Sequence, residues 1–367
     1  MSDILPTIGP ITSNYKSLKK ILKFSSLIRL NGSHSTISWH RVISKRVKKI
    51  NYDAKILLDL PGIKPRTENT KEVNIKKGER IIFCYGKKIF KNDKVIYVSK
   101  PLPLIKKKPY FFSLSDGKYK FKLVSLSKNF IKGISLDNFY LKPKQGLNIP
   151  RSIYNNKKQE DIYLKFIKKC KNIQYDAIGL SFVQNDKIVK KLKNKYKSTV
   201  IVSKIENSEG LRNLDSISKC SDAIMIDRGD LGAEIGEDNL FDSIIKISKN
   251  AKKYGKPLIM ATENLDSMLT KSSPTKSEIV SIGFSSLMNA DKIMLSDETA
   301  TSYNWHNTIK WLNKYLLSIK KSSKYNNNNN RTSHDLLWES ISKISNFPVI
   351  IFSRKGIAID RINQISN

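Results

Sequence analysis

Eight short runs rich in apolar and β-branched residues recur along the chain, and their spacing constrains the fold more than any other feature. The runs lie near residues 4–7, 26–30, 55–58, 177–182, 200–203, 223–226, 257–260 and 292–295. Stretches of helical length with one apolar face separate most of them, among them residues 13–24, 160–171, 239–253 and 276–288. Eight strands alternating with eight helices is the count of a TIM barrel. We therefore predict an α/β fold built on a closed parallel (β/α)8 barrel.

Polar residues follow all eight runs at the same end. In chain order these ends read TIGP, RLNGS, DLPG, SFVQ, SKIE, DRGD, ATEN and SDET. A single polar strand end normally indicates only the start of a surface loop. The carboxyl ends of all eight barrel strands, however, meet on one face, where such barrels build their active sites. Eight polar ends in succession therefore predict a functional site on that face.

A segment of different character, residues 68–146, interrupts the alternation after the third run. It contains short β-type runs such as ERIIFCYG and KYKFKLVSL, punctuated by Gly, Asp and Pro. We expect a small β-barrel lid domain here, inserted after strand 3 of a catalytic barrel made of residues 1–67 and 147–320. Residues 321–367 begin with a polar, Asn-rich stretch and hold too little apolar sequence for a core of their own. We expect them to form a linker and a truncated C-terminal α/β segment.

The chain is strongly basic, with 67 Lys and Arg against 32 Asp and Glu and a formal net charge of +35. Nucleic-acid binders often carry such a charge. Only 11 of the basic residues are Arg, however, and the Lys excess accompanies many Asn and Ile residues, which indicates genome composition. We therefore expect phosphorylated anions to be attracted by the positive field, and nucleic acid not to be a partner.

Hydrophobic residues make up 39% of the chain, which excludes wholesale disorder. No window has the apolar length of a membrane span, and the first residues lack a signal pattern. The three cysteines, Cys84, Cys170 and Cys220, are odd in number and too far apart for a CxxC metal site. We expect a cytoplasmic protein with no membrane partner.

Two consecutive strand ends, SKIE and DRGD, carry the most informative residues. Side by side, Glu206 and Asp230 would offer the one or two carboxylates that Mg²⁺ takes from a protein. Lys204 lies two residues before Glu206, so both side chains project to the same side of an extended strand. A cation there would stabilise charge that develops on a metal-bound oxyanion. An ordinary Lys204–Glu206 ion pair explains the same pattern about as well.

Other strand ends add weaker signals. Gly229, at the start of GDLG, offers backbone N–H groups that can bind a carboxylate or phosphate, although Gly often only marks a turn. Arg29, Asn31 and Ser33 alternate to one side of an extended segment. Together with Asp59 they form a polar cluster suited to a cation and a phosphate group.

These motifs, in this order, resemble those of the pyruvate kinase family. The resemblance runs from TIGP at residues 7–10 to SDETA at residues 296–300, about four-fifths of the chain. The other matching segments are RLNGSH (29–34), DLPGIKPRT (59–67), SKIENSEG (203–210), RGDLG (228–232) and PT (274–275). Any one segment would occur by chance, but their order and spacing together make coincidence improbable. The resemblance implies a TIM barrel, a lid inserted after its third strand and a C-terminal α/β domain.

By this resemblance the chain would be a glycolytic phosphotransferase. It would transfer the phosphoryl group of phosphoenolpyruvate to ADP and then protonate the enolate to pyruvate. Lys204 would neutralise the transferring group and the enolate oxygen, and Glu206 and Asp230 would hold Mg²⁺ or Mn²⁺. The N–H groups of Gly229 and Asp230 and the hydroxyl of Thr262 would bind the substrate carboxylate, with Thr262 near the protonation step. Catalysis of this kind relies on positioning and charge neutralisation.

The resemblance also implies contacts with phosphate groups and a monovalent cation. Arg29 would act as a catalytic residue and, with Arg66, contact phosphates. His34, which taken alone would more often be structural, would face the nucleotide. Lys64 stands where the family varies between Glu and Lys, and the Lys form resembles members that do not need potassium. We therefore expect K⁺ not to be required. The monovalent-cation site would be lined by Asn31, Ser33 and Asp59, with the ammonium of Lys64 in place of the ion.

Several positions depart from the family pattern. Asp227, Glu263 and Asp297 add acidic groups near a site meant for an anion, and Gln145 stands where a lid Lys is usual. Like charges there should oppose phosphoenolpyruvate unless metal ions or lysines neutralise them. Two alternatives stay open: a related Mg²⁺-dependent barrel enzyme acting on another enol or keto-acid substrate, and a catalytically decayed binding protein. The short C-terminal segment predicts no sugar-phosphate effector and a homo-oligomer of lower order than a tetramer.

Overall fold

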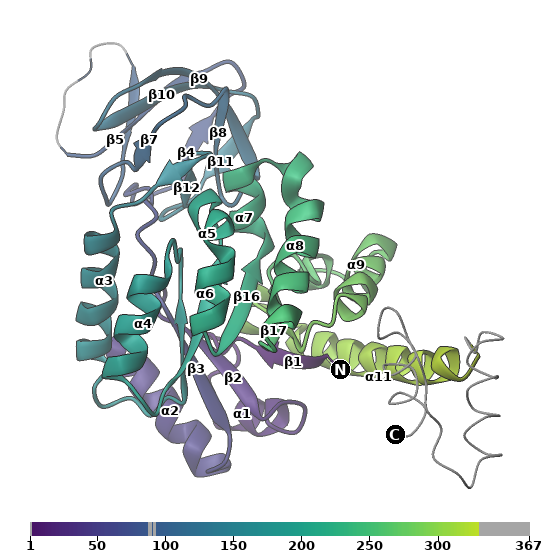
Figure 1. Cartoon of the computed structure of the whole chain (residues 1–367). Helices are drawn as coiled ribbons and strands as arrows, with labels where there is room; N and C mark the ends of the chain where they lie inside the picture. The colour runs from purple at the N-terminus through teal and green to yellow at the C-terminus, as the bar shows by residue number, and fades with distance from the viewer. Residues whose placement is uncertain (1, 87–89, 91–92, 330–367) are drawn as a thin grey trace, which may run out of the picture. The chain divides into compact units, whose positions relative to one another are not determined.

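The computed structural model describes residues 2–86, 90 and 93–329, the last nine of these as backbone only. The chain divides into two compact units, Met1–Asn313 and Lys314–Asn367. Figure 1 shows the elements of the first unit, which contains both the barrel strands and the inserted β-rich segment.

Eight parallel strands form the barrel, in the order β1-β18-β17-β16-β15-β14-β3-β2. They are β1 (Asp3–Pro6), β2 (Leu27–Asn31), β3 (Lys55–Leu60), β14 (Ala177–Leu180), β15 (Val200–Ile205), β16 (Ala223–Asp227), β17 (Leu258–Ala261) and β18 (Lys292–Leu295). A parallel bridge between Thr7 and Arg29 joins the two outer strands of this order, and the Ile8 N–H donates to the Arg29 carbonyl at 3.0 Å. The predicted TIM barrel is confirmed, and all eight predicted strands are present.

Apolar side chains at alternate strand positions fill the barrel interior. Leu57 of β3, Val202 of β15 and Met225 of β16 belong to one buried cluster with residues of the other strands. Because side chains alternate across a strand, residues two positions further on point to the same side. On these three strands the next inward positions are charged, so the apolar core ends where a charged barrel mouth begins.

The helices of the first unit follow the barrel strands and lie outside them (Figure 1). They are α1 (Tyr15–Ile21), α2 (Ile37–Ile50), α3 (Asn156–Lys169), α4 (Asp186–Lys195), α5 (Ser208–Arg212), α6 (Leu214–Cys220), α7 (Arg228–Ile235), α8 (Leu240–Lys253), α9 (Lys276–Leu287), α10 (Asp297–Ala300) and α11 (Trp305–Asn329), which continues into the second unit. Local sequence explains several starts; α9, for example, opens with a capping box in which Thr275 and Glu278 bond each other's backbone N–H. Of the helices within the described residues, each is too short or too polar to cross a bilayer.

The inserted segment folds around a core of its own. Its strands are β4 (Val73–Ile75), β5 (Arg80–Cys84), β6 (Lys94–Tyr97), β7 (Leu104–Ile105), β8 (Phe111–Leu114), β9 (Tyr119–Leu126), β10 (Phe130–Ser135), β11 (Phe139–Leu141), β12 (Leu147–Asn148) and β13 (Ser152–Ile153). Six form one sheet, β12-β8-β9-β10-β5-β6, around a cluster that includes Phe83, Phe112 and Phe121.

This lid continues past residue 146, where the sequence predicted its end. Strands β12 and β13 pair with the lid strands β8 and β7, and Leu147 and Ile149 belong to the lid core. Gly146 marks a turn in the sequence, but strand pairing across more than 30 residues leaves no local signal. The return to the barrel therefore lies between β13 and α3.

The final helix described also differs from the prediction. Helix α11 runs from Trp305 to Asn329, so residues 321–329, predicted as linker, are helical. Lys, Ser and Asn are polar but do not interrupt a helix, and no Gly or Pro occurs in α11. The predicted C-terminal helix and apolar run lie beyond residue 329, outside the described residues.

Candidate active site at the barrel mouth

Lys204 lies among carboxylates at the carboxyl ends of the strands. It follows Val202 on the inward side of β15, and its Nζ lies 2.7 Å from Glu206 Oε1, 3.2 Å from Asp59 Oδ2 and 3.4 Å from Asp227 Oδ2. All these side chains are buried. Burial alone would lower the pKa of Lys204, but the three carboxylates outweigh it and raise that pKa. Lys204 is therefore a permanently charged ammonium in a site of low dielectric.

At Glu206, in contrast to Lys204, the effect of burial on the pKa outweighs the effect of the neighbouring opposite charge. Its Oε2 accepts a hydrogen bond from the Phe182 N–H at 2.5 Å, whereas Oε1 has no hydrogen-bond partner apart from its ion-pair contact with Lys204. Burial raises the pKa of Glu206 to about 8, because the charges of Asp227 and Asp230 add to it and Lys204 offsets it only in part. At neutral pH the metal-free protein therefore holds Glu206 mostly protonated.

Glu206, Asp227 and Asp230 together form a candidate divalent-metal site. One carboxylate oxygen of each lies within 4.8 Å of the others. Hard oxygen ligands of this kind suit Mg²⁺ and Mn²⁺. The buried Glu206 Oε1 has no hydrogen-bond partner besides the Lys204 ammonium at 2.7 Å, so it would serve as a ligand in competition with that ammonium. The residues present therefore fit the ion, with Asp227 as a third acidic group beside the two predicted from the sequence.

Metal binding at this cluster should release a proton. A metal ligand must be deprotonated, and with its pKa near 8 Glu206 is mostly protonated at pH 7. We expect Mn²⁺ titrations at pH 7, followed by calorimetry in buffers of different ionisation enthalpy, to show close to one proton released per ion. The affinity for Mn²⁺ should rise with pH up to about 8 and level off above it. An affinity independent of pH between 6 and 8 would contradict this assignment.

The loop after β16 forms a cradle of hydrogen-bond donors beside the metal ligands. The Gly229 N–H donates to Thr262 Oγ1 at 3.1 Å, and Thr262 Oγ1 lies 3.0 Å from Asp227 Oδ1. Asp230 N–H points to the same Asp227 oxygen at 3.5 Å. The structure thus brings Gly229, Asp230 and Thr262 together, as the sequence predicted.

Arg228 fixes the loop that carries Thr262. Its Nε donates to the Thr262 carbonyl at 3.1 Å, and its NH2 group donates to Asn264 Oδ1 at 2.8 Å. Thr262 and Glu263 both have positive φ, 60° and 51°, a conformation that non-glycine residues adopt only when neighbouring contacts hold them. Arg228 therefore supports the hydroxyl of the cradle.

Arg29 points into the same mouth from β2. Its guanidinium pairs with Asp59 Oδ2 through Nε at 2.8 Å and NH2 at 2.7 Å, and NH1 donates to Thr7 Oγ1 at 3.0 Å. Burial would raise the pKa of Asp59, but Lys204 and Arg29 lower it, so its carboxylate stays ionised. Arg29, Asp59 and Lys204 thus form one charged network.

Of the residues predicted to bind the nucleotide, Arg29 belongs to this network, whereas Arg66 and His34 have other neighbours. The NH1 group of Arg66 donates to the Lys144 carbonyl at 3.1 Å, which links the loop after β3 to the end of the lid. Surrounding protein atoms and the charge of Arg66 lower the pKa of His34, against the opposing effect of Asp297. The His34 ring is therefore neutral at physiological pH. The charges of Arg66 and Asp297 both act on its pKa.

Lys64 forms ion pairs with a lid carboxylate and with one acid of the metal cluster. It was expected to substitute for a monovalent ion beside Asn31, Ser33 and Asp59. Its buried Nζ lies 2.5 Å from Asp230 Oδ1 and 2.5 Å from Asp116 Oδ1 of the lid. Asp59 is already neutralised by Arg29 and Lys204. The nearest unneutralised carboxylates decide where a buried ammonium lies.

Comparison with known proteins shows to which family the chain belongs. The family model "Pyruvate kinase, barrel domain" matches residues 1–308. The chain belongs to the pyruvate kinase family. It is 32% identical over 317 residues to the pyruvate kinase of Methanocaldococcus jannaschii, which covers 85% of this chain and 68% of that one. It is 31% identical to the enzyme of Thermococcus litoralis, covering 81% and 65%, and 30% identical to that of Encephalitozoon cuniculi, covering 85% and 74%.

Within this pyruvate kinase fold, three site residues escaped the sequence analysis. Asn148 Nδ2 donates to Asp230 Oδ1 at 3.0 Å, and Asp116 of the lid contacts Lys64. Ser181 Oγ lies 3.2 Å from Asp59 Oδ1 and 3.4 Å from Lys204 Nζ. Only Ser181, at a polar strand end, had a signal that would have identified it. The two lid residues lie far from the motifs in sequence.

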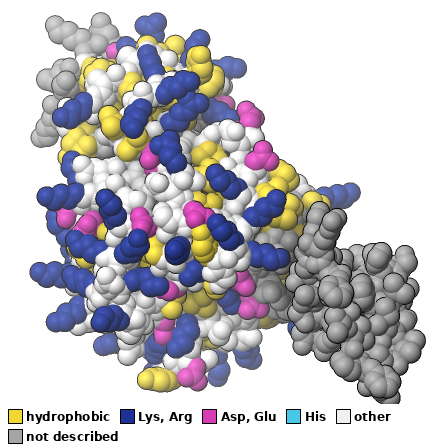
Figure 2. All heavy atoms as spheres, viewed as in Figure 1, with side chains coloured by type: hydrophobic (Ala, Val, Ile, Leu, Met, Phe, Trp, Pro, Cys, Tyr) yellow, Lys and Arg dark blue, Asp and Glu magenta, His cyan; other side chains and the backbone are white. Residues whose placement is uncertain are grey.

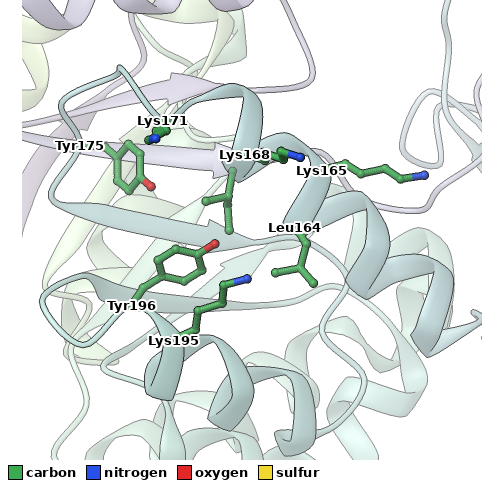
Figure 3. A pocket seen from close by; sticks show the side chains of 8 residues that line it. Leu164, Lys165, Lys168, Lys171, Tyr175, Lys195 and Tyr196 are labelled. Carbon is green, nitrogen blue, oxygen red and sulfur yellow. The ribbon is translucent and has the colours of Figure 1, made fainter.

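One surface hollow among the described residues lies away from this site. A pocket of about 450 Å³ lies at the carboxyl ends of α3 and α4, close to the amino ends of β14 and β15, and Figure 3 shows Tyr175 and Tyr196 within it. The lining residues are Leu164, Lys165, Ile167, Lys168, Lys171, Tyr175, Lys195 and Tyr196. The charged mouth is at the opposite ends of these strands, so this pocket takes no part in the chemistry described here.

Proposed function

We propose that this chain transfers the phosphoryl group of phosphoenolpyruvate to ADP, giving pyruvate and ATP, with Mg²⁺ or Mn²⁺ as cofactor. One observation carries the proposal: the ammonium of Lys204 lies within ion-pair distance of Glu206 and Asp227, and these two acids cluster with Asp230. Membership of the pyruvate kinase family supports it.

The charged groups of the mouth suit the bond-breaking step. As the bond between phosphorus and the enol oxygen breaks, negative charge grows on that oxygen while the phosphoryl group passes to ADP. A bound divalent ion would neutralise part of this charge. Lys204, with a side chain only 5% exposed, supplies a fixed positive charge that acts strongly because little water screens it. Arg29, held in place by Asp59 and Thr7, supplies a second.

The cradle suits the proton-transfer step. The enolate must take up one proton on carbon to become pyruvate. We assign binding of the substrate carboxylate to the N–H groups of Gly229 and Asp230 and to the hydroxyl of Thr262. Held in this way, the Thr262 hydroxyl is able to give its own proton to the enolate carbon and to regain one from water.

The lid completes the site. Asp116 reaches Lys64 at 2.5 Å, and Gln145 accepts a hydrogen bond from Ser115 Oγ at 2.6 Å. A Cβ at Gly229 would lie 3.2 Å from Asp116 Cβ, so glycine at this position leaves room for the close approach of the lid. Exclusion of water by this approach would strengthen each electrostatic contact in the mouth.

A coupled assay of pyruvate formation with Mg²⁺ or Mn²⁺, phosphoenolpyruvate and ADP tests the function. We expect turnover that requires all three components. Turnover only with a different phosphorylated enol or keto acid would replace this proposal with that of a related barrel enzyme. Failure of every such substrate, with RNA retention that falls steeply as salt rises, would indicate a binding protein.

The distribution of surface charge favours small phosphorylated ligands. Figure 2 shows Lys and Arg side chains spread over the visible face of the described residues, without a single stripe. Nucleic-acid interfaces gather basic residues on one face or along one helix. A spread field raises the local concentration of small anions in general. We therefore propose phosphoenolpyruvate and ADP, and not nucleic acid, as the partners.

Activity should not depend on potassium. Lys64 and Lys204 already place two ammonium groups beside the site carboxylates. We expect unchanged pyruvate formation when KCl replaces tetramethylammonium chloride at constant ionic strength. Lys64→Glu should make activity rise with added K⁺, because it removes one of these internal cations. A steep, saturable rise with K⁺ in the unaltered protein would refute the expectation.

A further inference from the structure

Asp227 occupies the place that the proposed function gives to the carboxylate of the substrate. Its Oδ1 lies 3.0 Å from the Thr262 hydroxyl and 3.5 Å from the Asp230 backbone nitrogen, which are two of the three donors of the cradle. Its Oδ2 lies 3.4 Å from Lys204 Nζ. The side chain is buried, so water does not screen its charge.

We propose that Asp227 is a resident carboxylate that competes with the substrate carboxylate for this cradle and so sets the affinity of the site for small carboxylates. The inference rests on the proposed function, because it takes the cradle to be the carboxylate subsite. A substrate must displace Asp227 from Thr262 and the Asp230 N–H before its own carboxylate can bind there. Two like charges that share one set of donors also repel each other.

The fold provides a place for the displaced carboxylate. One Asp227 oxygen already lies within 4.8 Å of carboxylate oxygens of Glu206 and Asp230. A divalent ion among these groups would attract Asp227 as the substrate enters. Asp227 is therefore a specificity-determining residue, which disfavours small carboxylates with the metal bound and disfavours them most strongly when the metal is absent.

If Asp227 served only as a helix cap, its substitution would affect stability and not carboxylate binding. Asp227 is the N-cap of α7, and its side chain accepts from the Asp230 N–H. A cap stabilises the helix and has no influence on ligand affinity. If Asp227 were only a cap, its replacement by Ala would lower the melting temperature and leave carboxylate binding unchanged. Asp227→Asn keeps a capping side chain and removes only the charge, so the two roles separate.

The test is direct calorimetric binding of oxalate to the Mg²⁺-saturated protein. We expect Asp227→Ala to bind oxalate at least about tenfold more tightly than the unaltered chain, because a buried like charge in contact with the ligand is removed. Asp227→Asn should shift affinity in the same direction by a smaller factor. ADP affinity should stay constant in both variants. Asp238→Ala, which removes an exposed acid of the short 3-10 helix Glu237–Asn239, is the control for net charge and should bind oxalate as the unaltered chain does.

Two results would overturn the inference. One is oxalate affinity in Asp227→Asn equal to or weaker than that of the unaltered chain, with an unchanged melting temperature. The other is weaker Mn²⁺ binding in Asp227→Ala with no gain in oxalate affinity, which would make Asp227 a metal ligand only. Failure of the proposed function is seen separately, as absence of pyruvate formation by the unaltered chain, whatever the oxalate affinities.

Discussion

Lys204→Met is expected to lower kcat for pyruvate formation by at least about 10²- to 10³-fold, the loss that follows removal of one preorganised group that stabilises transition-state charge. The reason is the position of the ammonium, buried 2.7 Å from Glu206 Oε1 and 3.2 Å from Asp59 Oδ2. Methionine keeps an unbranched apolar side chain of similar shape and removes the terminal ammonium with its charge. KM for ADP should change little, since Lys204 pairs with Asp59, Glu206 and Asp227 and not with the predicted nucleotide residues His34 and Arg66. The measurement is a steady-state comparison of kcat and KM in the coupled assay.

This substitution also leaves buried acids without their partner, so a control must separate chemistry from folding. Lys48 forms a partly buried ion pair with Asp176, 3.1 Å away, close to the amino end of β14. Lys48→Met should lower stability in a similar way and leave kcat unchanged. Equal losses of kcat in both variants, or full activity of Lys204→Met, would remove Lys204 from the mechanism.

Glu206→Gln is expected to weaken Mn²⁺ binding by more than the roughly 10- to 100-fold that loss of even an outer-shell partner of a metal site costs. Glutamine retains the shape and an acceptor for the Phe182 N–H, but it supplies no negative charge to the ion. Activity at limiting Mg²⁺ should fall by at least the same factor. The readout is free Mn²⁺, measured by electron paramagnetic resonance, so that it does not depend on turnover.

Glu234→Gln is the matched control for this experiment. Glu234 is also fully buried, and burial raises its pKa to about 8 as well. Its Oε1 accepts a hydrogen bond from the Tyr154 hydroxyl at 3.0 Å, and it is not among the clustered acids. Mn²⁺ affinity should therefore be preserved. Equal weakening in both variants would show that burial of any glutamate, and not ligation by Glu206, controls metal affinity.

The barrel was predictable from sequence because each of its parts has a local signal. A strand such as β15 is a short β-branched run, and a helix such as α4 has its own buried apolar face and its own cap, Asn185. The polar ends of successive strands needed only one further step, since closure of any such barrel brings the carboxyl ends together. The same reasoning placed Lys204, Glu206 and Asp230 near one another, and the structure brings them there.

Predictions were wrong or incomplete where the outcome depends on contacts between segments distant in sequence. The lid was predicted to end at residue 146, but β12 pairs with β8 and extends it. Lys64 was assigned a role by its position in a motif, whereas its partners Asp116, 52 residues away, and Asp230 follow only from the fold. Helix α11 continues through residues that resemble a linker.

The sequence by itself determined the family, the barrel and which residue types reach its mouth, because strand periodicity and short motifs are local properties of the chain. Only the tertiary structure decided how the charges pair: that Asp227 lies in the donor cradle, that Glu206 has a raised pKa and that the lid contributes Asp116 and Asn148. The physical reason is that Coulomb energy and desolvation depend on distances of a few ångströms between groups far apart in sequence.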